Sequence, residues 1–319
     1  MHCNTDMTGL EGYEALRSGA AWIDVSSRGR IRVTGEDRAR LLHAMTTNQV
    51  QQLTPGTGCY AFFLSAQGRI LADVNLLCRD DYFLLDTEPE THEKVYGHLD
   101  KYIIADDVTL EDVTESLAAI AIEGPQSAEI MRKLGAPLRD AEYGSDSWDS
   151  WLVARLSYAG ASGLVVFLPP GDKAQLTGRL EEAGAVQATS KALRVVRIEN
   201  GRPRYGEDIS ERFLAQETNQ SRALNFNKGC YLGQEIVERV RSRGQIHRVL
   251  TPLRIDSSVP PEPGTKLLDI AGANAAEITS AAFSPALGKV VALAYVRAEH
   301  AKPNEKLRLG ETEAVVAGC

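Results

Sequence analysis

Two periods of apolar residues run through the first part of the chain. Ile31 and Val33 alternate with arginines at period two, which predicts a half-buried strand, and apolar residues at helical spacing follow over 41–45. Apolar runs at 60–64 and 70–77 flank a turn-like sequence, so we predict a β-hairpin in which Gly68 takes a backbone angle that other residues avoid. Helices and hairpin-linked strands therefore share this region.

The same mixture of elements continues and then restarts near residue 115. A helix over 87–102, with Pro89 in its first turn, precedes a strand over 108–113. Two successive units of this kind indicate an α+β fold rather than a doubly wound parallel sheet. We expect one region over 1–245, with a second lobe at roughly 115–190. The strands of that lobe are expected at 117–122, 152–156 and 164–168, and its helices at 127–134 and 172–183.

A different pattern begins after Gly244. Six short apolar runs are separated there by Gly, Pro and Asn, which predicts a small all-β domain over 246–319. Before it, a helix from Ser190 stops at Gly201, and residues 202–227 are polar without periodicity. A loop of that length inside a compact region is usually functional or disordered. The six expected strands are 249–255, 266–270, 276–283, 290–296, 307–309 and 314–316.

Composition narrows the class of protein without naming an activity. The 319 residues are 43% hydrophobic and 24% charged, and the net charge of -8 argues against bulk nonspecific nucleic-acid binding. The five cysteines are odd in number, widely spread and never in a C-x-x-C pair, which disfavours a disulfide framework and a complete zinc site. We therefore predict no metal ligands and a reducing cytoplasm. No apolar run approaches the ~20 residues of a membrane span, so we expect a soluble protein.

A thiol lies just before a predicted helix in the sequence Lys228-Gly229-Cys230-Tyr231-Leu232-Gly233-Gln234-Glu235. Unpaired backbone N–H groups at the start of that helix, together with Lys228, would favour a thiolate at Cys230. A reactive cysteine is one interpretation. The alternative is a buried structural cysteine.

Two carboxylates elsewhere in the chain are candidate ligand-binding residues. Glu199 and Tyr205 lie just beyond a predicted helix end, and a carboxylate in a partly closed pocket accepts two hydrogen bonds from a planar heterocycle with adjacent N–H donors. A surface ion pair is the alternative for Glu199. Asp73, amid apolar neighbours on a predicted strand, is either a buried acid or the outward-facing residue of the alternation, and the sequence favours the second.

Basic residues crowd into the stretch after Cys230. Such a cluster could bind phosphate, a polyanionic tail or an RNA backbone, and its alternative is a solvated helix face. Few aromatic residues are interleaved with it, so stacking on single-stranded nucleic acid gains no support. The cluster comprises Arg239, Arg241, Arg243, His247 and Arg248.

These residues resemble a known signature. The stretch 228–235, followed by Arg239, Arg243 and Arg248, is similar to that of the YgfZ family of folate-binding proteins. Upstream, Thr46-Thr47-Asn48, Gly68-Arg69-Ile70 and Arg197-Ile198-Glu199 resemble the wider superfamily of the glycine-cleavage T-protein, an aminomethyltransferase. Together the matches cover nearly the whole chain in the right order.

The resemblance implies a two-lobed T-protein-like fold that forms a central tetrahydrofolate channel, with a C-terminal β-barrel packed on it. A glutamate at the position of Glu199 holds the pterin ring in that superfamily. The resemblance gives Cys230 and Asp73 as candidate catalytic residues. The candidate folate-binding residues are Glu199, Tyr205, Lys228, Gln234, Arg239 and Arg243.

Three functions follow as expectations. The YgfZ branch is associated with tetrahydrofolate-dependent assembly or maintenance of iron–sulfur proteins, including tRNA-modifying enzymes, so the first is a cytoplasmic folate-binding accessory factor whose partners are those proteins or their assembly machinery. The second is a folate-dependent one-carbon transferase, although T-proteins carry two adjacent aspartates where this chain has Ala72-Asp73. The third is an RNA-binding module over 239–248, with tRNA as its partner. Both an enzyme and a non-catalytic factor fit the sequence.

Overall fold

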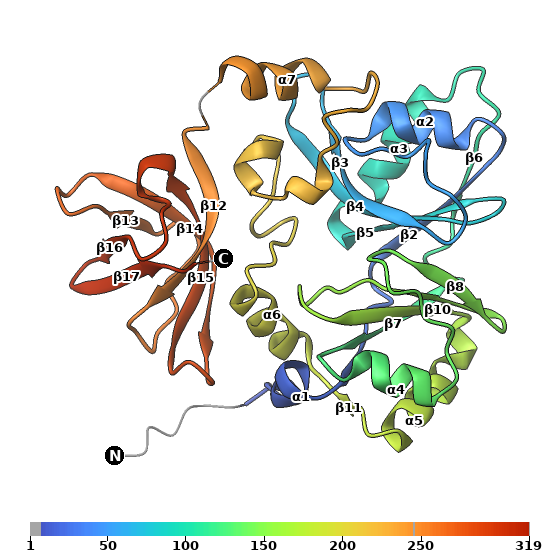
Figure 1. Cartoon of the computed structure of the whole chain (residues 1–319), viewed down its shortest axis with the longest axis horizontal. Coiled ribbons are helices and arrows are strands. Elements are labelled where there is room, and N and C mark those ends of the chain that lie inside the picture. Colours follow the sequence, from blue (N-terminus) through green and yellow to red (C-terminus); the bar gives the residue numbers. More distant parts are fainter. Residues whose placement is uncertain (1–7, 245, 319) are drawn as a thin grey trace.

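The computed structural model of the chain describes residues 8–244 and 246–318. Two sheets, each covered by helices on its outer face, and a β-barrel surround a common centre (Figure 1). The helix α6 (Ser190–Glu199) lies between the barrel and the two sheets. This confirms the expected α+β fold with an all-β barrel at its C-terminal end.

The first sheet is antiparallel with the strand order β3-β4-β5-β2-β6. Alternate residues along β3 and β4 face opposite sides, as the period of a strand requires. One side packs on α2 and α3, and the other side faces the second sheet. The elements are β2 (Gly29–Thr34), α2 (Arg38–Met45), β3 (Gly58–Leu64), β4 (Ile70–Cys78), β5 (Phe83–Thr87), the 3-10 turn η1 (Pro89–Thr91), α3 (His92–Tyr102) and β6 (Thr109–Asp112).

The hairpin predicted between β3 and β4 is confirmed. Gly68 has a φ of 71° and its N–H donates to the Ser65 carbonyl at 2.8 Å. The prediction of one helix over 87–102 was wrong at its start, because Thr87 ends strand β5 and Pro89 opens the separate turn η1. A Cβ atom on Gly68 would lie 2.7 Å from Ile236, so the hairpin tip packs closely against α7 (Gln234–Arg243).

The second sheet is mixed and has the strand order β11-β1-β7-β10-β9-β8. Its strand β1 (Ala21–Asp24) precedes the first sheet in sequence, yet pairs with β7 on one side and β11 on the other. The sequence pattern gave no sign of this strand or of α1 (Tyr13–Ser18). The other elements are β7 (Ala118–Glu123), α4 (Ser127–Lys133), β8 (Ser145–Trp148), β9 (Trp151–Ala154), β10 (Gly163–Leu168), the 3-10 turn η2 (Pro170–Asp172), α5 (Lys173–Glu182) and β11 (Val186–Gln187).

The barrel closes completely, with every strand paired on both sides. Residues 202–233 link α6 to α7 and contain only two short 3-10 turns, η3 (Ala215–Thr218) and η4 (Ser221–Ala223), in line with the absence of periodicity there. The barrel strands are β12 (Arg248–Ile255), β13 (Lys266–Leu268), β14 (Asn274–Ser284), β15 (Lys289–Arg297), β16 (Lys306–Leu309) and β17 (Thr312–Val316), with the 3-10 turn η5 (Ala298–His300) after β15.

One buried carboxylate fastens the barrel to the rest of the molecule. Asp208, fully buried in the segment after α6, accepts hydrogen bonds from Arg197 Nη1 at 2.6 Å and from the Arg204 backbone N–H at 3.1 Å. On the barrel side it accepts from the hydroxyls of Thr279 and Ser280 at 2.5 and 2.6 Å. The orientation of the barrel is therefore fixed by a polar contact as well as by apolar packing.

Among the residues that the structure describes, no helix has the length and apolar character needed to cross a membrane.

Candidate functional site

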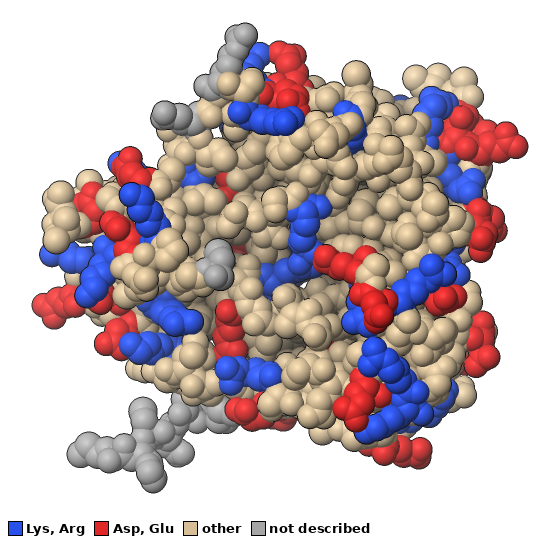
Figure 2. All heavy atoms as spheres, in the orientation of Figure 1, with Lys and Arg blue, Asp and Glu red and all other residues tan. Residues whose placement is uncertain are grey.

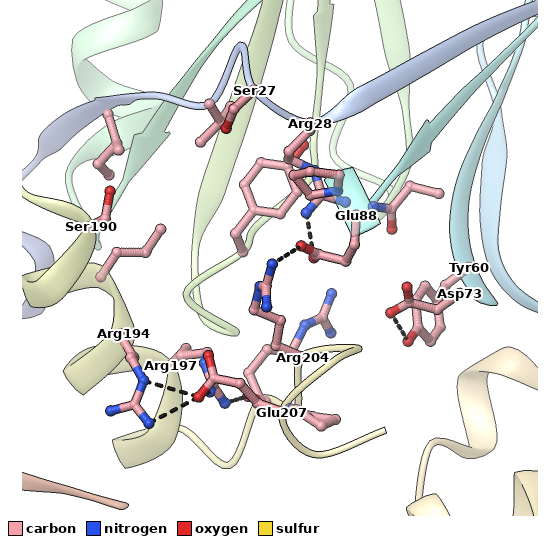
Figure 3. A pocket seen from close by; sticks show the side chains of 18 of the residues that line it. Ser27, Arg28, Tyr60, Asp73, Glu88, Ser190, Arg194, Arg197, Arg204 and Glu207 are labelled. Carbon is pink, nitrogen blue, oxygen red and sulfur yellow. Dashed lines mark hydrogen bonds and ion pairs between the residues drawn. The ribbon is translucent and has the colours of Figure 1, made fainter. Parts of the chain in front are cut away.

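A cavity of about 350 Å³ lies between the two sheets, α6 and the segment that follows α6. Figure 2 shows this face of the molecule hollowed near its middle, with basic and acidic side chains around the hollow. Charged side chains reach the cavity from several parts of the chain, as the close view in Figure 3 shows. The charged lining consists of Arg28, Arg194, Arg197, Arg202, Arg204 and Arg222, with Asp24, Asp73, Glu88 and Glu207.

Helix α6 supplies one wall of the cavity. The Thr189 hydroxyl accepts a hydrogen bond from the Ala192 N–H and so caps the start of the helix. Positions 190, 194 and 197 then recur on one face, because residues three and four apart on a helix are neighbours. Ser190, Arg194 and Arg197 line the cavity for this reason.

Two glutamates hold four of the arginines. At the centre of Figure 3, Glu88 pairs with Arg28 and with Arg204 Nη2, the second at 3.0 Å. On the α6 side, Glu207 accepts from Arg194 at 2.9 Å and from Arg197 at 2.7 Å. These charge-assisted pairs are partly or fully withdrawn from water, so they fix the positions of the side chains that line the cavity.

Asp73 is the carboxylate at the other end of the cavity. It is 8% exposed, and its Oδ2 accepts a hydrogen bond from the Tyr60 hydroxyl at 2.8 Å. The sequence favoured an outward-facing side chain at this position, and that was wrong: this face of β4 is turned toward the second sheet rather than toward water. Burial, and next the negative charge of Glu88, raise the pKa of Asp73 to about 6.

The loop 157–160 forms part of the wall and is held by a second buried acid. Glu123 accepts hydrogen bonds from the Ser157 hydroxyl at 2.7 Å and from the Tyr158 N–H at 2.6 Å. Burial raises the pKa of Glu123 to about 7 even though these donors favour its charged form. The anchored loop places Tyr158 in the cavity wall, where its ring lies 4.4 Å from the Arg28 guanidinium.

Glu199 and Tyr205, both expected to bind folate, do not line the cavity. The Tyr13 hydroxyl donates to Glu199 Oε1 at 2.5 Å and Arg17 Nε donates to Oε2 at 3.0 Å, so Glu199 ties α6 to α1. Glu199 follows Arg197 by two residues, which turns it to the opposite side of the helix. The buried Tyr205 hydroxyl donates instead to the Ile70 carbonyl.

Lys228 also lies outside the cavity lining, and its contacts are those of a residue that holds a loop in place. Its buried ammonium donates to the carbonyls of His43, Thr46 and Asn48 at 2.6, 2.6 and 2.7 Å. Burial lowers the pKa of Lys228 to about 7, whereas the three carbonyls at the end of α2 favour the charged form. The lysine therefore anchors its loop.

Cys230 is exposed on this anchored loop and has a free thiol. The helix α7 starts at Gln234, as the sequence predicted, and Gly233 with a φ of 83° precedes it. Neither Cys230 nor Gln234 lines the cavity. The structure therefore separates the thiol from Asp73, the other candidate catalytic residue.

Acidic residues on α7 and in the turn η3 partly neutralise the basic cluster after Cys230. Arg239 pairs with Glu235 at 2.7 Å and Arg241 with Glu238 at 3.6 Å, while Arg248 pairs with Glu217 at 2.9 Å. None of these arginines lines the cavity, and the side chain of Arg243 lies outside the described residues. This arrangement matches the solvated helix face that was the alternative interpretation.

Sequence reasoning missed most of the residues that do line the cavity. Arg202, Arg204 and Glu207 fall in the polar segment after α6, whose length marked it as functional without indicating which side chains matter. Arg28 and Glu88 lie at strand ends, where periodicity carries no information on side-chain direction. Of the candidate site residues whose side chains the structure describes, only Asp73 lies in the cavity.

Comparisons with known proteins agree on the fold. The chain matches the GCVT N-terminal domain over residues 6–228 and the glycine cleavage T-protein C-terminal barrel domain over residues 248–315. A chloroplastic protein of Arabidopsis thaliana that is named as a transferase is 30% identical over 308 residues, which cover 94% of this chain and 71% of that protein. The aminomethyltransferase of Rubrobacter xylanophilus is 30% identical over 295 residues, or 90% of this chain and 78% of that one.

Among solved structures, the glycine cleavage system aminomethyltransferase T from Bartonella henselae has a TM-score of 0.88 to this chain. The match covers 98% of this chain and 89% of the other, at 21% sequence identity. At that identity the likeness concerns the fold.

Proposed function

The chain belongs to the glycine-cleavage T-protein family, and from this premise we propose that it binds tetrahydrofolate in the cavity and takes part in one-carbon transfer at Asp73. Three of the four cavity carboxylates have basic partners: Asp24 pairs with Lys173, Glu88 with two arginines and Glu207 with two more. Asp73 has no basic partner among the described residues. This carboxylate, which accepts from the Tyr60 hydroxyl but makes no ion pair within the described chain, is the observation that carries the proposal.

The cavity has room for a heterocycle, since its volume of about 350 Å³ falls within the usual range for small-molecule sites. Its walls place the rings of Tyr60 and Tyr158 among charged side chains, several of which are fixed by ion pairs. Bound tetrahydrofolate would supply the amine that takes up a one-carbon unit. Asp73 has one oxygen committed to Tyr60 and the other available to accept a hydrogen bond from an amine. Orientation of the reacting group is the contribution that this carboxylate would make.

Calorimetric titration with tetrahydrofolate tests the proposal, and Glu199→Ala sharpens the test. We expect saturable binding to one site in the wild type and affinity within about twofold in the variant, because Glu199 faces away from the cavity. Loss of binding in Glu199→Ala, with the fold intact by circular dichroism, would restore the pterin role that the resemblance gave to Glu199. An absence of binding to the wild type would refute the proposed function.

A second candidate function is that of an accessory factor for iron–sulfur proteins, which the resemblance to the YgfZ signature suggests. One observation favours it: Lys228 and the hydrogen bond from the Leu232 N–H to the Ala44 carbonyl hold the loop so that Cys230 stays exposed. A single thiolate is an incomplete ligand set for a cluster, so any contact with one would be shared with another chain.

For this candidate we expect Cys230→Ser to abolish the cellular role while leaving tetrahydrofolate affinity unchanged, because the thiol lies outside the cavity. The measurement is the activity of a cluster-dependent tRNA-thiolating enzyme in cells that carry the variant, with calorimetry on the purified variant as its control. Normal activity of that enzyme would remove the cysteine from the function.

A further inference from the structure

Two of the six cavity arginines, Arg202 and Arg222, form no ion pair with a buried carboxylate among the residues that the structure describes. We propose that they form a subsite for a carboxylate group of the ligand at the Asp73 end of the cavity. The inference rests on the proposed folate site and adds the chemistry that a ligand must present there.

The two guanidinium groups keep donors available. Arg202 Nη2 donates to the Ser157 carbonyl at 3.3 Å, and the guanidinium also interacts with the Tyr143 side chain. Within the described chain, no carboxylate forms an ion pair with Arg202. Arg222 Nη1 donates to the Tyr143 hydroxyl and to Glu142, both at 3.0 Å, while its Nη2 has no partner within the described chain. The Glu142 side chain is 61% exposed, so water screens its charge.

Both groups converge on one aromatic ring. The guanidinium carbon of Arg222 lies 4.3 Å from the centre of the Tyr60 ring, and that of Arg202 lies 5.8 Å from it. The cavity carboxylate that contacts Tyr60 is Asp73. It accepts a hydrogen bond from the Tyr60 hydroxyl and carries at most one negative charge. Glu142 pairs with Arg222 from the exposed side, and the buried Glu123 is near enough to Arg202 for their charges to interact. A ligand carboxylate would therefore meet two guanidinium groups that make no ion pair with a buried side chain among the described residues.

The surroundings hold Arg202 in place. Gly160 has a φ of 85°, and a Cβ atom there would lie 2.7 Å from the Arg202 Cβ, so the stem of the arginine is packed against bare backbone. A planar guanidinium fork above an aromatic face matches the planar geometry of a carboxylate. A doubly charged phosphate fits less well, because Asp73 already places a negative charge beside the site.

Two sources could supply the carboxylate. One is the glutamyl end of tetrahydrofolate, and the other is a small amino acid that donates the one-carbon unit. Both present the carboxylate that the two arginines would recognise. Probes that carry the pterin, the glutamate or the amino acid separately distinguish the two sources.

The experiment compares the wild type with the double variant Arg202→Met and Arg222→Met, in which methionine keeps an apolar stem without charge. Arg239→Met is the matched control, because Arg239 is exposed on α7 and outside the cavity. The calorimetric probes are tetrahydrofolate, 6-methyltetrahydropterin, which carries no carboxylate, and p-aminobenzoyl-glutamate, which lacks the pterin. Sarcosine, titrated in the presence of saturating 6-methyltetrahydropterin, stands for an amino-acid donor.

If the glutamyl carboxylate occupies the subsite, the double variant loses roughly 10- to 100-fold in affinity for tetrahydrofolate and p-aminobenzoyl-glutamate and none for 6-methyltetrahydropterin. If an amino acid occupies it, sarcosine binding is lost and both pterins bind as before. Unchanged affinity for every probe overturns the subsite. If neither pterin binds the wild type, the proposed function fails, yet p-aminobenzoyl-glutamate binding that disappears in the double variant still supports the subsite.

Discussion

Asp208→Ala is expected to lower the free energy of unfolding by about 3 kcal/mol or more, the range found when one partner of a buried ion pair is removed. The substitution leaves the buried Arg197 with Glu207 as its remaining acidic partner, and it removes the acceptor of the Ser280 hydroxyl and of the Arg204 N–H. The Thr279 hydroxyl keeps the Leu293 carbonyl as an acceptor. Each buried donor left without an acceptor adds to the loss of stability. Urea denaturation followed by circular dichroism measures the change.

Asp256→Ala provides the matched control for this effect. Asp256 also lies in the barrel region and pairs with Lys289, but its side chain is 74% exposed. Surface pairs of this kind contribute little, so we expect a change below about 1 kcal/mol. Equal effects of the two substitutions would show that Asp208 does not fasten the barrel, and the stability of its attachment would then come from apolar packing.

Asp73→Asn should reduce the rate of one-carbon transfer by roughly 100-fold or more, in the range found when a positioned acid–base group is removed. Asparagine has the same shape and can still accept from the Tyr60 hydroxyl, so the change is confined to charge and proton affinity. The measurement is the turnover of an aminomethyl or methyl donor with tetrahydrofolate. Retained turnover would exclude Asp73 from the reaction and leave the accessory role as the better account.

The pH dependence gives the same residue an independent signature. A carboxylate accepts a hydrogen bond from an amine in its charged form, so activity should rise with pH through the pKa of about 6 and level off above it. In Asp73→Asn this inflection should disappear from the profile of kcat/KM. A profile that keeps the inflection assigns it to another group.

Stability distinguishes this loss from damage to the fold. The folded-state pKa of Asp73 is raised, so its contribution to stability is fully present below the unfolded value of about 3.8 and is lost as pH rises through about 6. The charged form therefore destabilises the protein at pH 7.5. We expect Asp73→Asn to be as stable as the wild type or more so, by up to about 3 kcal/mol, so lost activity could not be blamed on unfolding.

Local patterns predicted the elements better than their assembly. The hairpin at Gly68 and the strands of the barrel follow from turn residues and short apolar runs, which act over a few neighbouring positions. The place of β1 in the second sheet does not, because its partners β7 and β11 lie far along the chain. No local period encodes which distant strand a four-residue strand will meet.

Local sequence also does not determine which side chains reach the cavity. Glu199 was a reasonable carboxylate by type, but the phase of α6 turns it toward Tyr13 rather than the cavity. Lys228 was placed beside Cys230 by sequence, whereas its ammonium is held by carbonyls at the end of α2. Arg202 lies outside any helix or strand and Arg222 in the short turn η4, and only the folded chain brings both to the ring of Tyr60.

The position of β1 has a consequence for synthesis on the ribosome. Ala21, Trp22 and Ile23 are buried only when β7 pairs with them, and about 100 residues separate β1 from the end of β7. At typical rates of translation those residues take roughly 5 to 20 s to make. During that interval the first sheet can be completed while β1 stays an apolar strand with unpaired edges, so the nascent chain offers chaperones a binding segment near its own beginning.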